Sequence, residues 1–241
     1  MISIKNINKS YNGYTKVVDN LSLDIRPGEI FGFLGPNGAG KTTTIKMMTG
    51  ITKPDQGTIH INGKGIQEDP VRAKKEFGFV PDNPNIFLRL KGIEYLNFMA
   101  DAYGVEKKLR IKRIQSLSER FSMTKVLSDQ INSYSHGMRQ KIVIIGVLLH
   151  SPNVWILDEP MTGLDPKASH LLKVMMKEHT AQNKSVFFST HVLEVAEKIC
   201  DRVAIINQGK ILYVGSVEEI KEKSQENKDL ESIFLELTKN E

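Results

Sequence analysis

A glycine-rich segment ahead of a lysine constrains the possible fold of this chain more than any other feature of the sequence. It follows the apolar run Ile30–Leu34 and reads Gly35-Pro36-Asn37-Gly38-Ala39-Gly40-Lys41-Thr42. It matches the pattern G-x-x-x-x-G-K-[ST] between a predicted strand and a helix predicted from Lys41. Glycines let backbone N–H groups turn toward phosphate oxygens, and the helix N-terminus adds a favourable dipole. This strand–loop–helix unit predicts a nucleoside triphosphate site.

The polar side chains of this loop have separate predicted roles. Lys41 supplies positive charge to the β- and γ-phosphates, and the Thr42 hydroxyl reaches Mg²⁺. The next hydroxyl, on Thr43, is expected to contact the α-phosphate. The predicted nucleotide-binding residues of the loop are Asn37, Gly38, Ala39, Gly40, Lys41, Thr42 and Thr43.

A second apolar run, Val154–Leu157, ends in the acids Asp158 and Glu159. Parallel sheets bind ligands at the carboxyl ends of their strands. Asp158 can hold Mg²⁺ through a water molecule, and Glu159, on the opposite side of an extended chain, can act as general base on the attacking water. Alone, the run also describes a strand followed by a charged turn. The phosphate loop favours the catalytic interpretation.

A third segment, around Ser135 and Gly137, precedes an apolar helix. A serine and a glycine at a helix N-terminus can bind an anion. By itself, the segment is more often an ordinary helix cap.

The order of these segments resembles the ATP-binding cassette (ABC) family. The resemblance extends over roughly residues 1–216 and rests on five motifs in sequence. These motifs are the phosphate loop, Ser135-His136-Gly137, Leu157-Asp158-Glu159-Pro160, Thr162-Gly163-Leu164-Asp165-Pro166 and Ser189-Thr190-His191.

The resemblance implies roles for five further residues. Tyr11 is similar to the aromatic residue that stacks on adenine, although it could also be a core or surface tyrosine. Ser135 and Gly137 resemble the signature residues that contact the γ-phosphate held by a second subunit, and Asp165 resembles the interface aspartate that joins the two sites. His191 resembles the histidine that touches the γ-phosphate and steadies the attacking water. An isolated histidine after a strand would more often be structural.

The chain departs from the family pattern in two places. The signature carries Tyr134, His136 and Met138 where leucine, glycine and glutamine are usual. Asp82 stands where the family usually has a glutamine that contacts Mg²⁺ and water. Asp82 is therefore a candidate metal ligand, but we favour a loop that senses the membrane partner, because a carboxylate near the γ-phosphate would repel it.

The segment around Asp82 also indicates a branch of the family. Residues 81–94 and the pair Tyr103-Gly104 resemble the bacterial exporter branch called ABC-2. The resemblance implies two ATP molecules held with Mg²⁺ in a head-to-tail dimer of this chain. A transmembrane permease on a separate chain would couple the ATP cycle to export.

The expected fold is α/β: a P-loop NTPase core with a parallel sheet flanked by helices. An antiparallel β subdomain precedes this core, and a helical subdomain is inserted into it. We expect residues 1–82 to form the first part of the core, 83–150 the helical subdomain with the signature, and 151–217 the second part. Residues 218–241 are expected to form a helical tail, and we favour a solvated helix over a regulatory contact for residues 221–241.

Composition narrows the setting of the protein. The 241 residues carry a formal charge of +5 that is spread through the sequence, so nucleic-acid binding is not expected. One cysteine, Cys200, excludes an internal disulfide and a multi-cysteine metal site. The longest apolar stretch, Ile142–Leu149, is too short to span a bilayer. We expect a protein at the cytoplasmic face of the cell membrane, attached through its permease partner.

Three alternatives remain at this stage. The chain could be an ABC importer subunit, or a non-transport ABC ATPase acting on nucleic acid or ribosomes. About ninety residues separate the phosphate loop from the signature and show no sustained heptads, which disfavours a chromosome-maintenance relative. A nucleotide kinase or GTPase would leave the signature, interface and histidine motifs unused.

Overall fold

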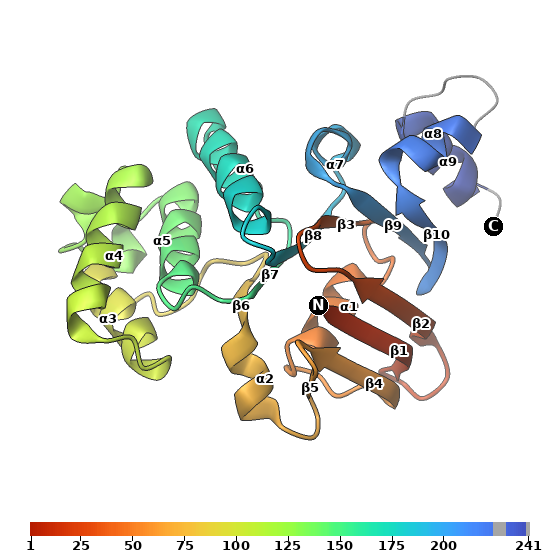
Figure 1. Cartoon of the computed structure of the whole chain (residues 1–241), viewed down its shortest axis with the longest axis horizontal. Helices are drawn as coiled ribbons and strands as arrows, with labels where there is room; N and C mark the ends of the chain where they lie inside the picture. Colours follow the sequence, from red (N-terminus) through yellow and green to blue (C-terminus); the bar gives the residue numbers. More distant parts are fainter. Residues whose placement is uncertain (224–229, 240–241) are drawn as a thin grey trace.

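The computed structural model describes residues 1–223 and 230–239, which form two sheets and the helices packed on them (Figure 1). A four-stranded antiparallel sheet has the order β2-β1-β4-β5. Its strands are β1 (Ile2–Ser10), β2 (Lys16–Ile25), β4 (Gln56–Ile61) and β5 (Lys64–Gly65). Alternating side chains of β1 are buried, as expected for a strand with one face on the core.

The second sheet has six strands in the order β10-β9-β3-β8-β7-β6. Its strands are β3 (Ile30–Leu34), β6 (Phe77–Val80), β7 (Val154–Leu157), β8 (Ser185–Thr190), β9 (Arg202–Asn207) and β10 (Lys210–Ser216). The first five run parallel, and β10 pairs antiparallel with β9 at the edge. Every residue of β3 and β7 is buried, which explains their unbroken apolar sequences.

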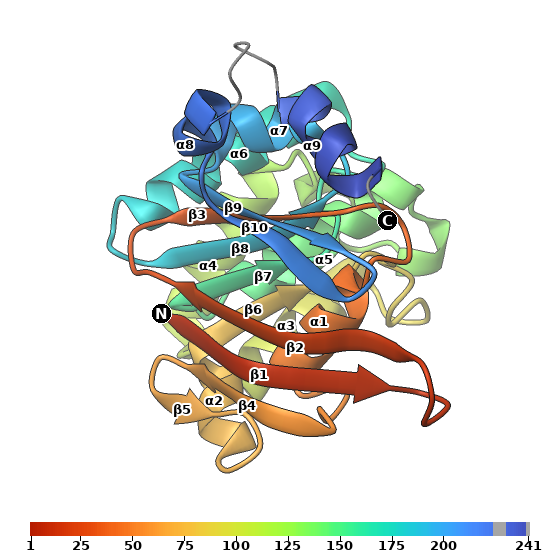
Figure 2. The ribbon, with the colours of Figure 1, turned by 90° about the vertical axis from the view of Figure 1, so that its right-hand side faces the viewer.

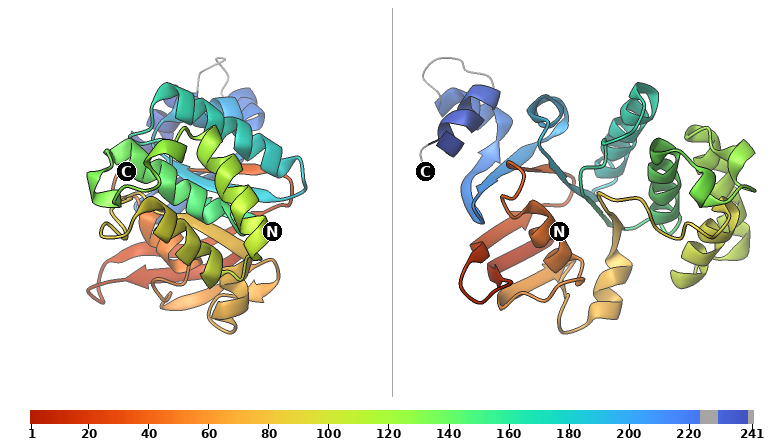
Figure 3. Two further views of the ribbon diagram at one scale, coloured as in Figure 1. Left: turned by 90° about the vertical axis from the view of Figure 1, so that its left-hand side faces the viewer. Right: turned by 180° about the vertical axis from the view of Figure 1, so that it is seen from behind.

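Helices cover the six-stranded sheet, and the two sheets lie one above the other in the side view (Figure 2). The helices are α1 (Lys41–Met48), α2 (Pro70–Glu76), α3 (Gly92–Ala102), α4 (Lys107–Arg120), α5 (His136–Leu148), α6 (Pro166–Thr180), α7 (Leu193–Ile199), α8 (Val217–Lys223) and α9 (Leu230–Lys239), with 3₁₀ turns at Thr124–Val126 and Ile131–Ser133. Helices α3, α4 and α5 stand together beside the sheet (Figure 3). The predicted fold class is therefore confirmed.

Two apolar cores hold these layers. One fills the space between the antiparallel sheet, α1 and one face of the six-stranded sheet, and includes Ile4, Ile45 and Phe187. The other joins the helices from α3 to α6 to the opposite face of that sheet. The apolar stretch of α5 lies within this second core, where Ile142 and Ile145 are fully buried.

The C-terminal part of the chain differs from expectation. Strand β10 was not predicted, although it contains the apolar run Ile211–Val214; most of its residues are only partly buried, as expected for a strand at the edge of the sheet. The expectation of a solvated tail helix is wrong, because Leu230 and Ile233 of α9 are buried in a third core with Ala196 of α7. Residues 224–229 and 240–241 of the predicted tail lie outside the described residues.

Among the residues that the structure describes, no helix combines the length and the apolar character needed to cross a bilayer.

Candidate functional site

The phosphate loop wraps around the buried ammonium group of Lys41. The Lys41 Nζ donates to the carbonyl oxygens of Gly35 at 2.7 Å and Pro36 at 3.1 Å. Gly40, just before α1, has a φ of 105°, and a Cβ at this position would lie 2.7 Å from the Val17 carbonyl oxygen. Only glycine fits there, and this tight approach sets the start of α1. The loop thus presents Lys41 and the N-terminus of α1 to the same space.

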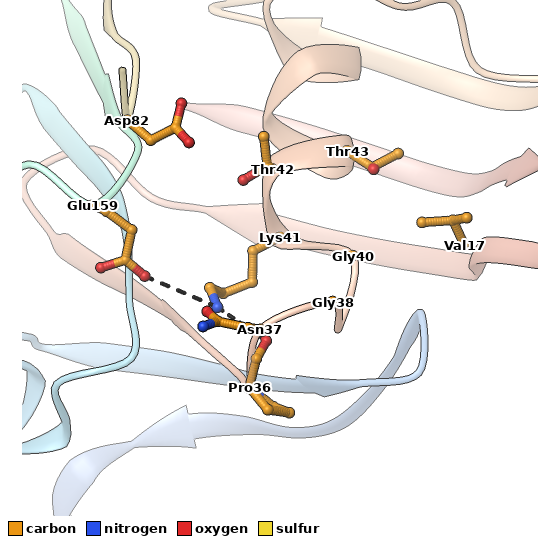
Figure 4. Close-up of a pocket in the computed structure, with 10 residues that line it drawn as sticks. All are labelled: Val17, Pro36, Asn37, Gly38, Gly40, Lys41, Thr42, Thr43, Asp82 and Glu159. Carbon is orange, nitrogen blue, oxygen red and sulfur yellow. Dashed lines mark hydrogen bonds and ion pairs between the residues drawn. The ribbon is translucent and has the colours of Figure 1, made fainter. Parts of the chain in front are cut away.

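A cavity of about 250 Å³ opens at this loop (Figure 4). Its walls come from the phosphate loop and the start of α1, from the chain after β6 and β7, and from β2. The lining residues are Val17, Pro36, Asn37, Gly38, Gly40, Lys41, Thr42, Thr43, Asp82 and Glu159. The structure therefore brings Asp82 and Glu159 to the phosphate loop, as the order of parallel strands requires.

Asp158 lies buried at the end of β7, next to the neighbouring strand β8. Leu157 pairs with Phe188, so Ser189 lies beside Asp158. The Ser189 hydroxyl donates to Asp158 Oδ1 at 2.5 Å and accepts from the backbone N–H of Glu159 at 3.0 Å. Burial raises the pKa of Asp158, while hydrogen bonds from Ser189 and Thr42 act in the opposite direction. Asp158 is thus tied to the hydroxyl at the start of α1.

Glu159 bends the chain away from β7 in a left-handed conformation, with a φ of 46°. Its Oε1 atom lies 3.0 Å from Nδ1 of His191 and 3.9 Å from Nζ of Lys41. This buried oxygen accepts no well-aligned hydrogen bond from the described residues. Burial lowers the pKa of Lys41, and the carboxylates of Glu159 and Asp158 oppose that shift. A strained backbone with a poorly satisfied carboxylate oxygen is typical of a site built to meet a ligand or a water.

The oxygen donors at this cavity fit a magnesium ion that is bound together with phosphates. They comprise the Thr42 hydroxyl and the Asp82 carboxylate, which line the cavity, and the Asp158 carboxylate, which is hydrogen-bonded to Thr42; such oxygens are hard ligands. In Figure 4 the Asp82 carboxylate points toward Thr42. No cluster of three or more His, Cys, Asp or Glu side chains able to hold a metal occurs among residues 1–223 and 230–239. Mg²⁺ commonly takes one or two carboxylates and completes its shell with phosphate oxygens and water.

The predicted signature residues lie apart from this cavity. Ser135 caps α5 and accepts from the Met138 N–H at 3.3 Å. A Cβ on Gly137 would lie 2.6 Å from the Gly163 carbonyl oxygen, so this glycine packs against the loop after Glu159. Neither residue lines the phosphate-loop cavity.

The remaining predicted site residues also lie outside the cavity lining. Asp165 caps α6 through the Ala168 N–H and forms an ion pair with Lys141 at 2.6 Å, which lowers the pKa of Asp165. Tyr11 lies in the β1–β2 loop with 62% of its surface exposed. Ala39 is buried and does not line the cavity, and Asp158 and His191 are also absent from the lining.

Sequence reasoning missed three residues of the site. Ser189, within a recognised motif, was given no role, although a hydroxyl on the strand next to Asp158 was a usable signal once the strand order was known. Val17 and Pro36 line the cavity. Val17 carries no sequence signal for this, because β2 reaches the loop only through the tertiary fold.

Comparisons with a family model, with the sequences of known proteins and with solved structures all give the same family. The family described as ABC transporter matches residues 18–162. The chain is 36% identical to the ABC-type transporter ATP-binding protein EcsA of Bacillus subtilis, over 100% of this chain and 98% of the relative. It is 34% identical to the Nod factor export ATP-binding protein I of Cupriavidus metallidurans, over 91% of this chain and 72% of that protein.

Solved structures agree with this assignment. An ATP-binding subunit of an ABC transporter superposes with a TM-score of 0.94 at 32% identity, over 98% of this chain and 99% of that chain. A dimeric ATP-binding cassette in a post-hydrolysis state, bound to ADP and Pi, superposes with a TM-score of 0.81 at 23% identity, over 90% and 98%, and shows the shared fold. The chain belongs to the ABC transporter family, as an ATP-binding protein.

Proposed function

We propose that this chain hydrolyses ATP and thereby powers export through a separate transmembrane subunit at the cytoplasmic face of the cell membrane. The observation that carries the proposal is the cavity in which Lys41 and Glu159 face each other. A cation for the phosphates and a carboxylate for the attacking water are the two groups that phosphoryl transfer to water needs side by side.

The chemistry is assigned to the residues of this cavity. The loop N–H groups and Lys41 bind the β- and γ-phosphates. Glu159 accepts a proton from a water molecule while the water oxygen attacks the γ-phosphorus. The bond between the γ-phosphorus and the oxygen that bridges to the β-phosphate breaks, which gives ADP and inorganic phosphate. His191, 3.0 Å from Glu159, orients that carboxylate and the water. Thr42, Asp158 and Asp82 would hold Mg²⁺, which neutralises phosphate charge when bound.

A second copy of the chain would complete each site. Ser135 and Gly137 lie outside the cavity of their own chain, yet they form a helix N-terminus suited to an anion. A two-fold head-to-tail dimer would place each signature over the partner's nucleotide and give two equivalent sites. ATP differs from ADP by the γ-phosphate, so ATP binding would favour closure and phosphate release would favour opening. The dimeric cassette found among the similar structures supports this arrangement.

The name of one relative supports a role in export, and the names of others support a role in ABC transport. One relative is named a Nod factor export ATP-binding protein, and another is the ATP-binding protein NatA of Bacillus subtilis, 33% identical over 98% of this chain and 97% of that protein. A further structural neighbour is described as part of the ABC transporter complex cbiONQ. We infer a permease partner for this chain on the same grounds.

Two measurements test the proposal. The purified chain should release phosphate from ATP, and Lys41→Ala should abolish that release. Affinity purification from detergent-solubilised membranes should recover a multi-span membrane protein together with the chain. Recovery of ribosomal proteins or DNA in its place would contradict the transport assignment, and would leave the ATPase assignment standing.

A further inference from the structure

Helix α7 begins two residues after His191, and the placement of that histidine depends on this helix. His191 lies between the end of β8 and the start of α7. Because 54% of its side chain is exposed, burial alone restrains the position of the imidazole only weakly. The seven residues of α7 are too few to form a stable helix alone. Its N-terminus, at Val192, has no side-chain cap. Tertiary packing must therefore hold α7 in place.

The packing partners of α7 include β3, β8 and the C-terminal helix α9. Ala196 of α7 is fully buried in an apolar cluster with the end of β3 and with strand β9. The same cluster contains residues of α8 and α9 that we call the tail residues: Val217, Ile220, Leu230 and Ile233. Helices α7 and α9 are in contact, and Figure 2 shows them side by side above the six-stranded sheet.

The cluster also reaches the phosphate loop. Leu34, the last residue of β3, is fully buried in it and directly precedes Gly35. The tail residues thus share one apolar cluster with Leu34, which precedes the phosphate loop, and with α7, which follows His191. No other described helix joins both segments through this cluster.

We propose that the α8–α9 segment positions His191 for catalysis by holding α7, with Leu230 and Ile233 as positioning residues. This inference rests on the proposed ATPase function. A short helix without a side-chain cap shifts when an apolar neighbour is removed from one of its faces. A displacement of about 1 Å at a catalytic group can cost up to about 100-fold in rate. Loss of tail packing is therefore expected to reduce turnover more than ATP binding.

The first test compares two alanine substitutions two residues apart on α9. Ile233→Ala removes a side chain that is 6% exposed, and Leu235→Ala removes one that is 43% exposed. We expect Ile233→Ala to lower kcat for ATP hydrolysis about fivefold to tenfold, with KM for ATP changed less than about twofold. Leu235→Ala should leave both constants unchanged. Equal effects of the two substitutions, or a loss of ATP affinity alone, would overturn the inference.

The second test measures the NMR signal of the His191 imidazole. The chain has six histidines, so ¹³C-histidine labelling gives a small set of imidazole signals, and His191→Ala identifies the one from His191. Ile233→Ala should shift that signal in the nucleotide-free protein, and Leu235→Ala should not. An unmoved His191 signal would refute the positioning role whether or not the protein hydrolyses ATP. Absence of ATPase activity in the wild type, with the signal shifted as expected, would instead refute the proposed function.

A double-mutant cycle separates positioning from general destabilisation. If the tail acts through His191, Ile233→Ala should lower the residual activity of His191→Ala by much less than it lowers wild-type activity. If Ile233→Ala lowers the activity of His191→Ala by the same factor as it lowers wild-type activity, the inference is contradicted. Circular dichroism confirms that each variant is folded. Ile233→Val, which removes a single methylene, replaces Ile233→Ala in all three tests if the alanine variant unfolds.

Discussion

Nδ1 of His191 lies 3.0 Å from Oε1 of Glu159, and the same oxygen lies 3.9 Å from Nζ of Lys41. One carboxylate thus stands between a residue that follows β8 and a residue that begins α1. Glu159 and Lys41 line one cavity but carry opposite charges, so the loss of each side chain should affect a different step of the ATP cycle.

Glu159→Gln should retain ATP binding and slow hydrolysis about 10²–10⁴-fold, because the amide keeps the shape of the side chain but accepts no proton. The variant should accumulate as an ATP-bound dimer. Phosphate release and size-exclusion chromatography with ATP check both points, and a run with ADP is the control. Wild-type turnover in the folded variant would remove Glu159 from the base role.

Lys41→Ala should weaken ATP binding at least about 30-fold, because the buried ammonium that faces the phosphates is removed. Lys46→Ala is the matched control, since Lys46 lies exposed on the same helix. Isothermal titration of ATP into each variant measures the effect. Equal affinities for the two variants would contradict the assignment of the phosphate loop.

Asp82→Ala should raise the Mg²⁺ concentration needed for half-maximal hydrolysis about tenfold. The structure moves our expectation toward this outcome, because Asp82 lines the cavity and acts electrostatically on Asp158. A Mg²⁺ titration of ATPase activity measures it, with Asp82→Gln, the residue usual in the family, as the comparison. An unchanged Mg²⁺ requirement, with transport lost in the presence of the permease, would support the partner-sensing role.

His179 gives a prediction on stability and pH away from the cavity. Burial, together with the nearby charge of Lys184, lowers the pKa of His179 to about 4. The folded state therefore disfavours the charged imidazole, and the free energy of unfolding should fall as pH drops below about 6.5 toward 4. His179→Phe keeps the stack on Trp155, whose ring centroid lies 4.3 Å from that of His179.

Over that pH range, the free energy of unfolding should fall by about 1–2 kcal/mol less in His179→Phe than in the wild type. Urea denaturation at pH 7 and pH 4.5 measures the difference between the two proteins. His170→Phe, at an exposed position of the same helix, is the control. Identical pH profiles for wild type and His179→Phe would show that the charge on His179 does not matter to stability.

Elements with a strong local pattern could be predicted from the sequence. The apolar runs Ile30–Leu34 and Val154–Leu157 have the bounds of strands β3 and β7. Continuous apolar runs mark strands buried on both faces, and the glycine-lysine pattern fixes the loop between strand and helix. The motifs in their order were also sufficient to indicate the family.

Which residues meet at the site depends on the tertiary fold. Ser189 and Asp82 come from distant segments and reach the site because β8 and β6 end at one edge of the parallel sheet. Val17 reaches the cavity from β2 of the other sheet. We expected residues 221–241 to form a solvated helix, although half of the α9 residues are apolar and Leu230, Ile233 and Phe234 recur at helical spacing. Their burial depends on a partner surface made by α7 and β9, and no pattern within α9 itself can reveal that surface.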